Sequence, residues 1–165
     1  MRRILKFSEL FNSFYPWETE VETGTMASYD FDSPAGKYRV SFNISVLRSA
    51  EGELPSHDEI FSGIVKDSEY PITVAKLSFS LQGKQSITGT GEQFTVFSTV
   101  RMILRHFSRR YSHVNYLYFS AKESSRKKLY RAFSADLEKN VPEWEWVDMK
   151  DITFLGEETY IFIRK

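Results

Sequence analysis

Alternating apolar and polar residues mark the clearest strands of this chain. The alternation is strongest in the second half of residues 25–47, where a Ser-Pro-Ala-Gly segment separates it from a weaker alternation. Because the side chains of a strand point alternately to its two faces, this pattern predicts a hairpin over 25–47. The face of the second strand that we expect to be buried carries Tyr38, Val40, Phe42, Ile44 and Val46.

Later apolar runs predict further strands. A strand is expected over 72–82, and a buried central strand over 114–121, where the apolar run is nearly continuous. A short strand is expected over 143–146, where Trp and Glu alternate, and a terminal hairpin over 152–163.

Apolar residues at helical spacing predict three helices. The first covers residues 4–14 and ends before Pro16, the second follows Gly91, and the third is capped by Ser124 or Ser125. The elements together predict a mixed α/β (α+β) fold with a largely antiparallel sheet flanked by helices. One helix of this fold crosses between two near-parallel strands.

At 165 residues the chain is expected to form a single domain over 1–165. The N-terminal helix and hairpin fall within 1–70, and the rest of the core within 72–165. The polar stretch 48–70 predicts a surface loop with one helical turn around 59–65. His57, Asp58 and Glu59 are consecutive there and do not converge on one ion, so we expect no metal site.

The composition of the chain bears on three questions, namely disulfides and metal sites, membrane spans, and surface charge. The chain has no Cys, which excludes disulfides and thiolate metal sites. No apolar run approaches the roughly 20 residues of a membrane span, and Glu9 and Asn12 interrupt the apolar start, so we expect an unprocessed cytoplasmic protein with no membrane contact. The net charge is zero, yet residues 101–131 hold nine Lys and Arg against one acid. This block predicts either two solvated helix faces or a basic surface.

A glycine pair provides the candidate for phosphate chemistry. Gly89-Thr90-Gly91 directly precedes a predicted helix, and amides at a helix start can hold a phosphate. The segment lacks the third glycine of a dinucleotide fingerprint and the Gly-Lys-Ser/Thr of a P-loop. A tight turn without a ligand is therefore the alternative.

The order glycine turn, helix, strand and Leu-Tyr helix resembles the core half of the GNAT N-acetyltransferase superfamily. Gly89 and Gly91 match the two small positions of the family's turn, and Leu129-Tyr130 matches its Leu-Tyr. The resemblance covers roughly residues 72–165. It implies that acetyl-CoA binds with its pyrophosphate on the turn amides and that Tyr130 protonates the departing thiolate.

The same segment departs from the GNAT pattern at several positions. Ser86 stands where the family has Gln or Arg, Lys122 and Arg126 stand where it has Asn and Ala, and Ser134 follows in place of its Gly. The blocks ITGTG-x5-VFSTV and YFSAKESSRKKLYRAF are similar to those of a group of uncharacterised bacteriophage proteins. That likeness implies a phage-encoded protein in the host cytoplasm or on the virion.

Three functions follow from these observations. The first is an acyl-CoA-dependent N-acyltransferase in which Gly89, Thr90 and Gly91 bind the pyrophosphate and Tyr130 is the general acid. Arg126 or Lys127 would bind the nucleotide phosphate of acetyl-CoA. Glu123 and His106 are the candidate general bases by residue type. The second is a non-catalytic GNAT-like module that binds a host factor or a phage component. The third is nucleic-acid binding, because basic and aromatic residues interleave between 101 and 131.

Overall fold

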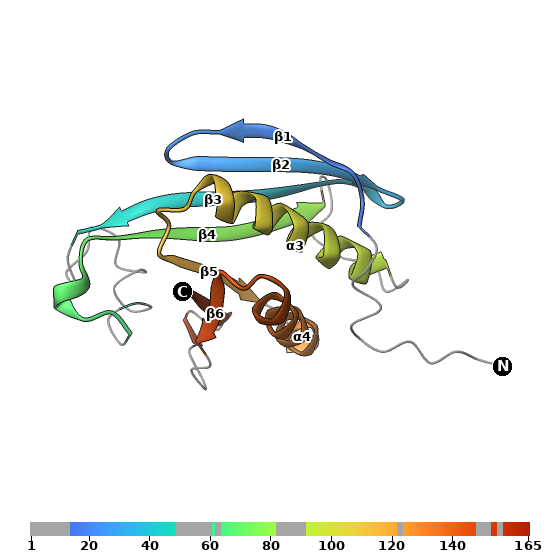
Figure 1. The fold of residues 1–165 in the computed structure, drawn as a ribbon. Coiled ribbons are helices and arrows are strands. Elements are labelled where there is room, and N and C mark those ends of the chain that lie inside the picture. Colours follow the sequence, from blue (N-terminus) through green and yellow to red (C-terminus); the bar gives the residue numbers. More distant parts are fainter. Residues whose placement is uncertain are drawn as a thin grey trace. The chain divides into compact units, whose positions relative to one another are not determined.

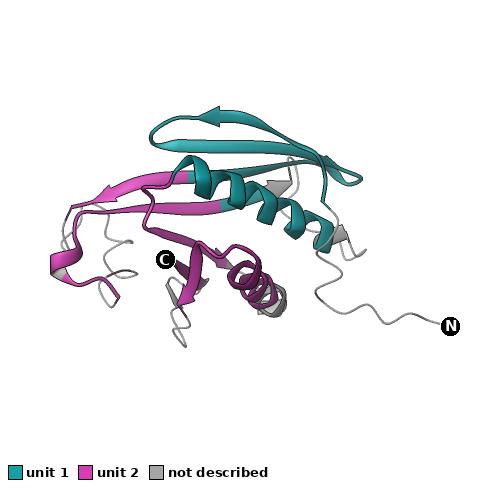
Figure 2. Cartoon of the chain, in the orientation of Figure 1, with its two compact units in different colours: residues 1–42, 78–111 teal, residues 43–77, 112–165 magenta. Residues whose placement is uncertain are grey.

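The computed structural model describes residues 14–48, 61, 64–81, 92–121, 124–147, 153–154 and 157–165. Within them it describes the backbone alone for residues 67, 80–81, 92–93, 121, 124–129, 153–154 and 157–158. The chain folds into two compact units, with residues 1–42 and 78–111 in unit 1 and residues 43–77 and 112–165 in unit 2 (Figure 2). A single domain over 1–165 stays a prediction.

The elements follow the predicted order, with one additional strand at the start (Figure 1). The helices are α3 (Glu92–Arg110) and α4 (Ser124–Asn140), and a short 3-10 turn, η1, covers Asp67–Glu69. The strands are β1 (Trp17–Glu22), β2 (Met26–Ser33), β3 (Gly36–Leu47), β4 (Ile72–Leu81), β5 (Tyr116–Ala121), β6 (Trp144–Val147), β7 (Thr153–Phe154) and β8 (Glu157–Arg164).

Hydrogen bonds join the described strands in the order β1-β2-β3-β4-β5-β8-β6, with β7 paired to β8. β1 and β2 are antiparallel, as are β8 and each of its partners β5, β6 and β7. β4 and β5 are parallel, and α3 is the connection between them. The predicted mixed α/β fold with a mostly antiparallel sheet is confirmed, and so is the helix crossover.

The core of unit 1 is built between α3 and the strands of that unit. Phe107 of α3 stacks on Phe42 of β3, with ring centroids 3.9 Å apart and planes 5° apart. Nearer the start of the helix, Phe97 meets Phe79 of β4 edge-on at 5.5 Å. These contacts follow from the apolar stripe of the helix sequence, since residues at helical spacing share one face.

The core of unit 2 lies on both faces of β5. Phe119 packs toward α4 beside Phe133, at 6.0 Å between ring centroids. Tyr116 and Tyr118 point to the other face, where Phe61 meets both rings edge-on at 5.4 and 5.6 Å. All the β5 residues from Tyr116 to Phe119 are buried, so the predicted central strand is confirmed.

Three details of the sequence prediction were wrong or missing. Val46 is 58% exposed, because the alternation shifts at the end of β3 and Leu47 takes the buried position. Phe61 and Val65 are buried in the core of unit 2, although the polar residues around them predicted a surface loop. Burial of these two apolar side chains is favourable because it removes their apolar area from water. β1 was not predicted at all. The predicted helix over 4–14 lies outside the described residues, apart from position 14.

Candidate functional site

Most of the predicted catalytic and cofactor-binding residues lie outside the residues whose side chains the structure describes. Gly89, Thr90, Gly91 and Glu123 fall outside the described residues. Arg126 and Lys127 belong to the first turns of α4, where the backbone alone is described. α3 begins at Glu92, directly after Gly91 in the sequence, which is the order that the phosphate-binding hypothesis requires.

Tyr130, the predicted general acid, has surroundings that the structure describes. It lies on α4, half-buried, with its ring centroid 6.2 Å from Tyr160 and 6.0 Å from Phe119. Phe119 and Tyr160 are partners across the β5–β8 ladder and stack at 5.1 Å. α4 therefore holds Tyr130 against an aromatic pair at the far end of β5.

The parallel ladder of β4 and β5 stops before either strand ends. Its partners are Val74 with Tyr116, Ala75 with Leu117, and Lys76 with Tyr118. β4 continues to Leu81 and β5 to Ala121, while the β5–β8 ladder runs on to the last residue of β5. In the described ladders the final three residues of β5 therefore have partners on β8 alone.

Three polar side chains that the structure describes on this part of β5 and its β8 partner are neutral at physiological pH, namely those of Tyr118, Ser120 and Thr159. Burial raises the pKa of Tyr118 to about 12. The hydroxyl groups of Ser120 and Thr159 lie 3.2 Å apart and form a hydrogen bond. These groups can orient a polar ligand, whereas none of them is a base at neutral pH.

In unit 1, Trp17 and Glu22 of β1 both point toward α3, although an odd number of positions separates them in the strand. The register between β1 and β2 shifts between Thr19 and Val21. A one-residue bulge reverses the alternation of a strand, so Trp17 and Glu22 point to the same face although they are five positions apart. Both meet His106, whose ring centroid is 5.0 Å from that of Trp17.

Glu22 joins β1 to the end of α3. Its Oε1 lies 3.1 Å from His106 Nε2, and its Oε2 accepts a hydrogen bond from Arg110 Nε at 2.9 Å. The neighbouring Tyr111 donates its hydroxyl to the carbonyl of Thr23 at 2.8 Å. His106 and Arg110 are four positions apart and share one side of the helix, so a single carboxylate holds both.

The charge of Glu22 is stabilised by its partners. Burial acts to raise the pKa of this carboxyl, but the hydrogen bonds and charges of His106 and Arg110 lower it below its usual value. Burial, and then the charge of Glu22, raises the pKa of Tyr29 and of Tyr111. At neutral pH the cluster therefore holds an ionised carboxylate beside two neutral phenols.

Substitution of Glu22→Gln is expected to lower the unfolding free energy by about 1 kcal/mol at pH 7, because two charge-assisted hydrogen bonds are weakened. Since the folded pKa of Glu22 is depressed, its contribution is present above the unfolded pKa, about 4.3, and is lost as pH falls through the folded value. Thermal melts of both proteins from pH 7 to pH 3 measure this. A difference in melting temperature that grew toward low pH would contradict the assignment.

A hollow of about 240 Å³ opens beside Trp17 on the β1–β2 side of unit 1. Asp30 at its wall is held by Arg39 through two hydrogen bonds of 2.9 and 3.0 Å, and those bonds lower its pKa. Its charged lining is mainly acidic, so we expect it to disfavour an anionic ligand such as a nucleotide phosphate. The lining residues are Pro16, Trp17, Glu18, Asp30, Phe31, Asp32 and Lys37.

His106, a candidate base by residue type, has a carboxylate partner that positions its ring. It also lies fourteen residues after Glu92 within α3, which at 1.5 Å per residue is about 21 Å along the axis. A phosphate at the start of α3 and the Glu22–His106 pair are therefore separate features of unit 1.

The sequence reasoning missed Trp17 and Glu22. The stretch Trp17-Glu-Thr-Glu-Val-Glu22 alternates and could have predicted β1, but Glu at every second position reads as a solvated segment. Only the bulge brings Glu22 to the helix, and a bulge leaves no clear mark in this stretch.

Comparison with known proteins leaves the family open. No protein-family model matches the sequence, and no curated protein or solved structure matches the chain. The likenesses to acetyltransferases and to phage proteins therefore stay predictions that depend on the residues quoted for them.

Two further findings concern metals and membranes. Within the described ranges, no group of three or more His, Asp or Glu side chains is placed to hold a metal ion. Neither described helix is long and apolar enough to cross a membrane.

Proposed function

We propose that the chain is a GNAT-like, acyl-CoA-dependent N-acyltransferase, encoded by a phage. The strand order supports this proposal, with antiparallel strands first, then a parallel pair joined by a helix, and then α4. Along the sequence, Gly89-Thr90-Gly91 come before α3 and Tyr130 belongs to α4, which is the order of parts in that superfamily.

The observation that carries the proposal is the short parallel ladder. β4 and β5 pair over three residues and then both continue, so the backbone of β5 after Tyr118 has no β4 partner in the described ladder. An unpaired strand edge offers donors and acceptors to an extended ligand. Tyr130 lies against Phe119, which is the first β5 residue beyond the ladder.

The roles of the residues follow from their chemistry. Amides of Gly89, Thr90 and Gly91 would hold the pyrophosphate, and Arg126 or Lys127 would meet the nucleotide phosphate. The bound thioester supplies an acetyl group and a sulfur that needs a proton when the carbon–sulfur bond breaks. Tyr130 Oη would donate that proton, and Glu123 is the candidate to accept one from the amine.

A non-catalytic binding module is the second candidate, and the packing of Tyr130 favours it. Its ring lies within 6.2 Å of both Phe119 and Tyr160, as a purely structural tyrosine would. The departures from the GNAT pattern at Lys122, Arg126 and Ser134 point the same way. Such a module would bind a host factor or a phage component.

Acetyl-CoA binding and turnover together test both candidates. The acyltransferase predicts that acetyl-CoA binds and that primary amines then cause release of free CoA thiol. The module predicts that thiol release stays at the rate of buffer alone for every amine. Detection of the protein in purified phage particles would support the module's virion role.

A further inference from the structure

β6 of unit 2 directs part of its backbone away from the described sheet. It is the last strand in the described order, and it pairs with β8 over Trp144–Val147 without a register shift. Lys165 donates its amide to the carbonyl of Glu143 at 2.9 Å, and backbone groups alternate between the two sides of a strand. The N–H and C=O groups of Trp144 and Trp146 therefore point away from β8.

The two outward amides have partners that do not belong to a strand. Trp144 donates to the carbonyl of Val141 at 3.1 Å, within the turn that leads into β6. Trp146 donates to Glu138 Oε2 at 2.8 Å. Glu138 is exposed and belongs to the last turns of α4, which lies beside β6 (Figure 1). Its carboxylate occupies the position that a carbonyl of a further strand would take.

The side chains along this edge place an acid and an apolar group on each face of the strand. On the face toward α4, Glu138 lies beside the half-buried ring of Trp146. On the opposite face, the exposed Glu145 precedes the half-buried Val147 by two positions. Lys139 is also exposed, but successive residues of a helix lie about 100° apart around its axis, so it points away from the side of Glu138.

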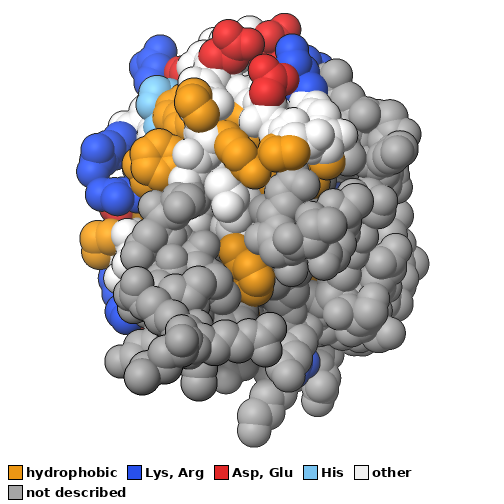
Figure 3. Space-filling model, turned by 90° about the vertical axis from the view of Figure 1, so that its right-hand side faces the viewer, with side chains coloured by type: hydrophobic (Ala, Val, Ile, Leu, Met, Phe, Trp, Pro, Cys, Tyr) orange, Lys and Arg blue, Asp and Glu red, His pale blue; other side chains and the backbone are white. Residues whose placement is uncertain are grey.

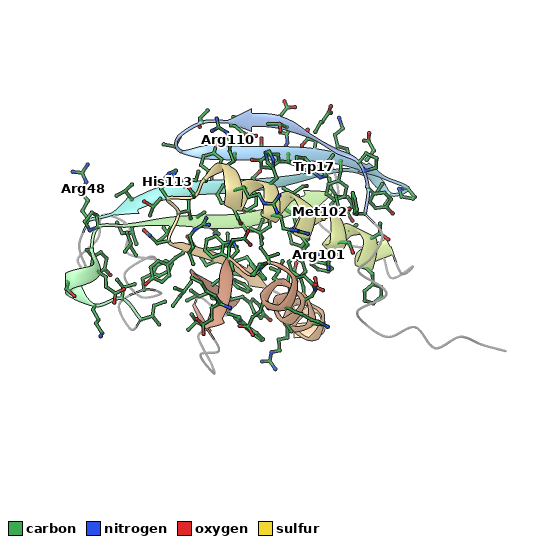
Figure 4. The ribbon with its side chains drawn as sticks, viewed as in Figure 1. Trp17, Arg48, Arg101, Met102, Arg110 and His113 are labelled. Carbon is green, nitrogen blue, oxygen red and sulfur yellow. The ribbon has the colours of Figure 1, made fainter. Side chains whose placement is uncertain are left out.

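The strand at the other end of the described order is protected in a different way. β1 has a register shift between Thr19 and Val21, and such bulges discourage the pairing of a further strand. Its Glu22 is held by His106 and Arg110, and Arg110 extends from α3 toward β1 in Figure 4. Figure 3 shows Asp and Glu side chains at the top of its face with Lys and Arg on both sides of them. β6 is therefore the better edge for an added strand.

We propose that β6 accepts an extended basic segment of a partner protein as an additional strand, which displaces the Glu138 carboxylate from the amide of Trp146. A carbonyl of the added strand would then accept the hydrogen bond of that amide, as in other cases of strand addition. A Lys or Arg of the segment would pair with Glu145 across the new ladder, and its other side chains would contact Trp146 and Val147. This activity goes beyond acyl transfer and uses none of the residues assigned to it.

Charge favours a basic partner over a second copy of this chain. Two copies of β6 that paired edge to edge would bring Glu138 and Glu145 of one copy close to the same acids of the other. Like charges on adjacent strands destabilise a sheet, whereas opposite charges stabilise it.

Fluorescence anisotropy with a labelled eight-residue peptide of alternating Lys and Thr, at low salt, tests the proposal. Glu138→Ala is expected to tighten binding about threefold, because the peptide no longer displaces a carboxylate from the amide. Glu145→Ala is expected to weaken binding about threefold, because a cross-strand ion pair is lost. Each variant is the control for the other, since both remove one negative charge from an exposed position of unit 2.

The backbone of the peptide provides the second control. A peptide of the same sequence with every backbone amide methylated keeps its charges but cannot pair as a strand, so it is expected not to bind. The proposal is overturned if this peptide binds equally well, or if both variants weaken binding equally, because either result indicates attraction by charge alone. It is also overturned if no binding occurs up to about 1 mM peptide. A dimer in sedimentation that Glu138→Ala strengthens would identify a second copy as the occupant and would likewise overturn it.

Discussion

Replacement of Tyr130 by phenylalanine is expected to lower the rate of acyl transfer by roughly 100-fold or more, because general-acid catalysis contributes about that much. The affinity for acetyl-CoA should change little, since the ring that packs against Phe119 and Tyr160 is retained. Steady-state thiol release measures the rate, and calorimetry measures the affinity. A loss that becomes smaller at high pH, where the thiolate can leave without a proton, is expected of a general acid and not of a structural tyrosine.

Tyr116→Phe is the matched control for this substitution. Tyr116 lies on β5 in the same unit, and its hydroxyl is 3.4 Å from Glu69 at the opposite end of the strand from Phe119. Its loss should leave thiol release within about twofold of the wild type, because the hydroxyl makes one long hydrogen bond and none to the residues around Tyr130. If both variants kept full activity, Tyr130 would not be the general acid.

Truncation of Phe107 to alanine is expected to cost about 3–5 kcal/mol of unfolding free energy. Phe107 is fully buried, and its ring stacks on Phe42 and, at 4.8 Å, on Tyr111. The removed ring would leave a cavity between α3 and β3 that the flat neighbouring rings cannot fill. For a chain of this length the melting temperature should fall by roughly 10 °C.

Phe14→Ala is the control for that truncation, because the same atoms are removed from a side chain that is 50% exposed. Its cost should be about 1 kcal/mol or less. Denaturant unfolding of the two variants measures the difference. Equal costs would show that Phe107 is not part of a packed core in solution.

The sequence predicted elements whose periodicity is uninterrupted. α3 and α4 have apolar stripes at helical spacing, and β5 is apolar on both faces, so local pattern and final burial agree. The errors lie at positions where tertiary contacts, and not the local pattern, determine which side chains are buried. Leu47 replaces Val46 in the core because the alternation shifts at the strand end, and Phe61 is buried by rings that are distant in sequence.

The candidate site was less predictable than the fold. Tyr130 was found from its position in a Leu-Tyr pair, and the structure places it at an aromatic pair that no local pattern specifies. The partner of His106 was not found, because Glu22 reaches it through a bulge between Thr19 and Val21. Pairing across 84 positions depends on the register of two strands, which single-residue properties do not encode.

The most direct test of the proposed function is a calorimetric titration of the protein with acetyl-CoA, with dephosphorylated CoA as the comparison ligand. We expect saturable one-to-one binding of acetyl-CoA, weaker binding of the dephosphorylated form, and amine-dependent thiol release by the same sample. Absence of any binding heat up to about 1 mM acetyl-CoA, where the interaction would be worth about 4 kcal/mol or less, would contradict the proposal.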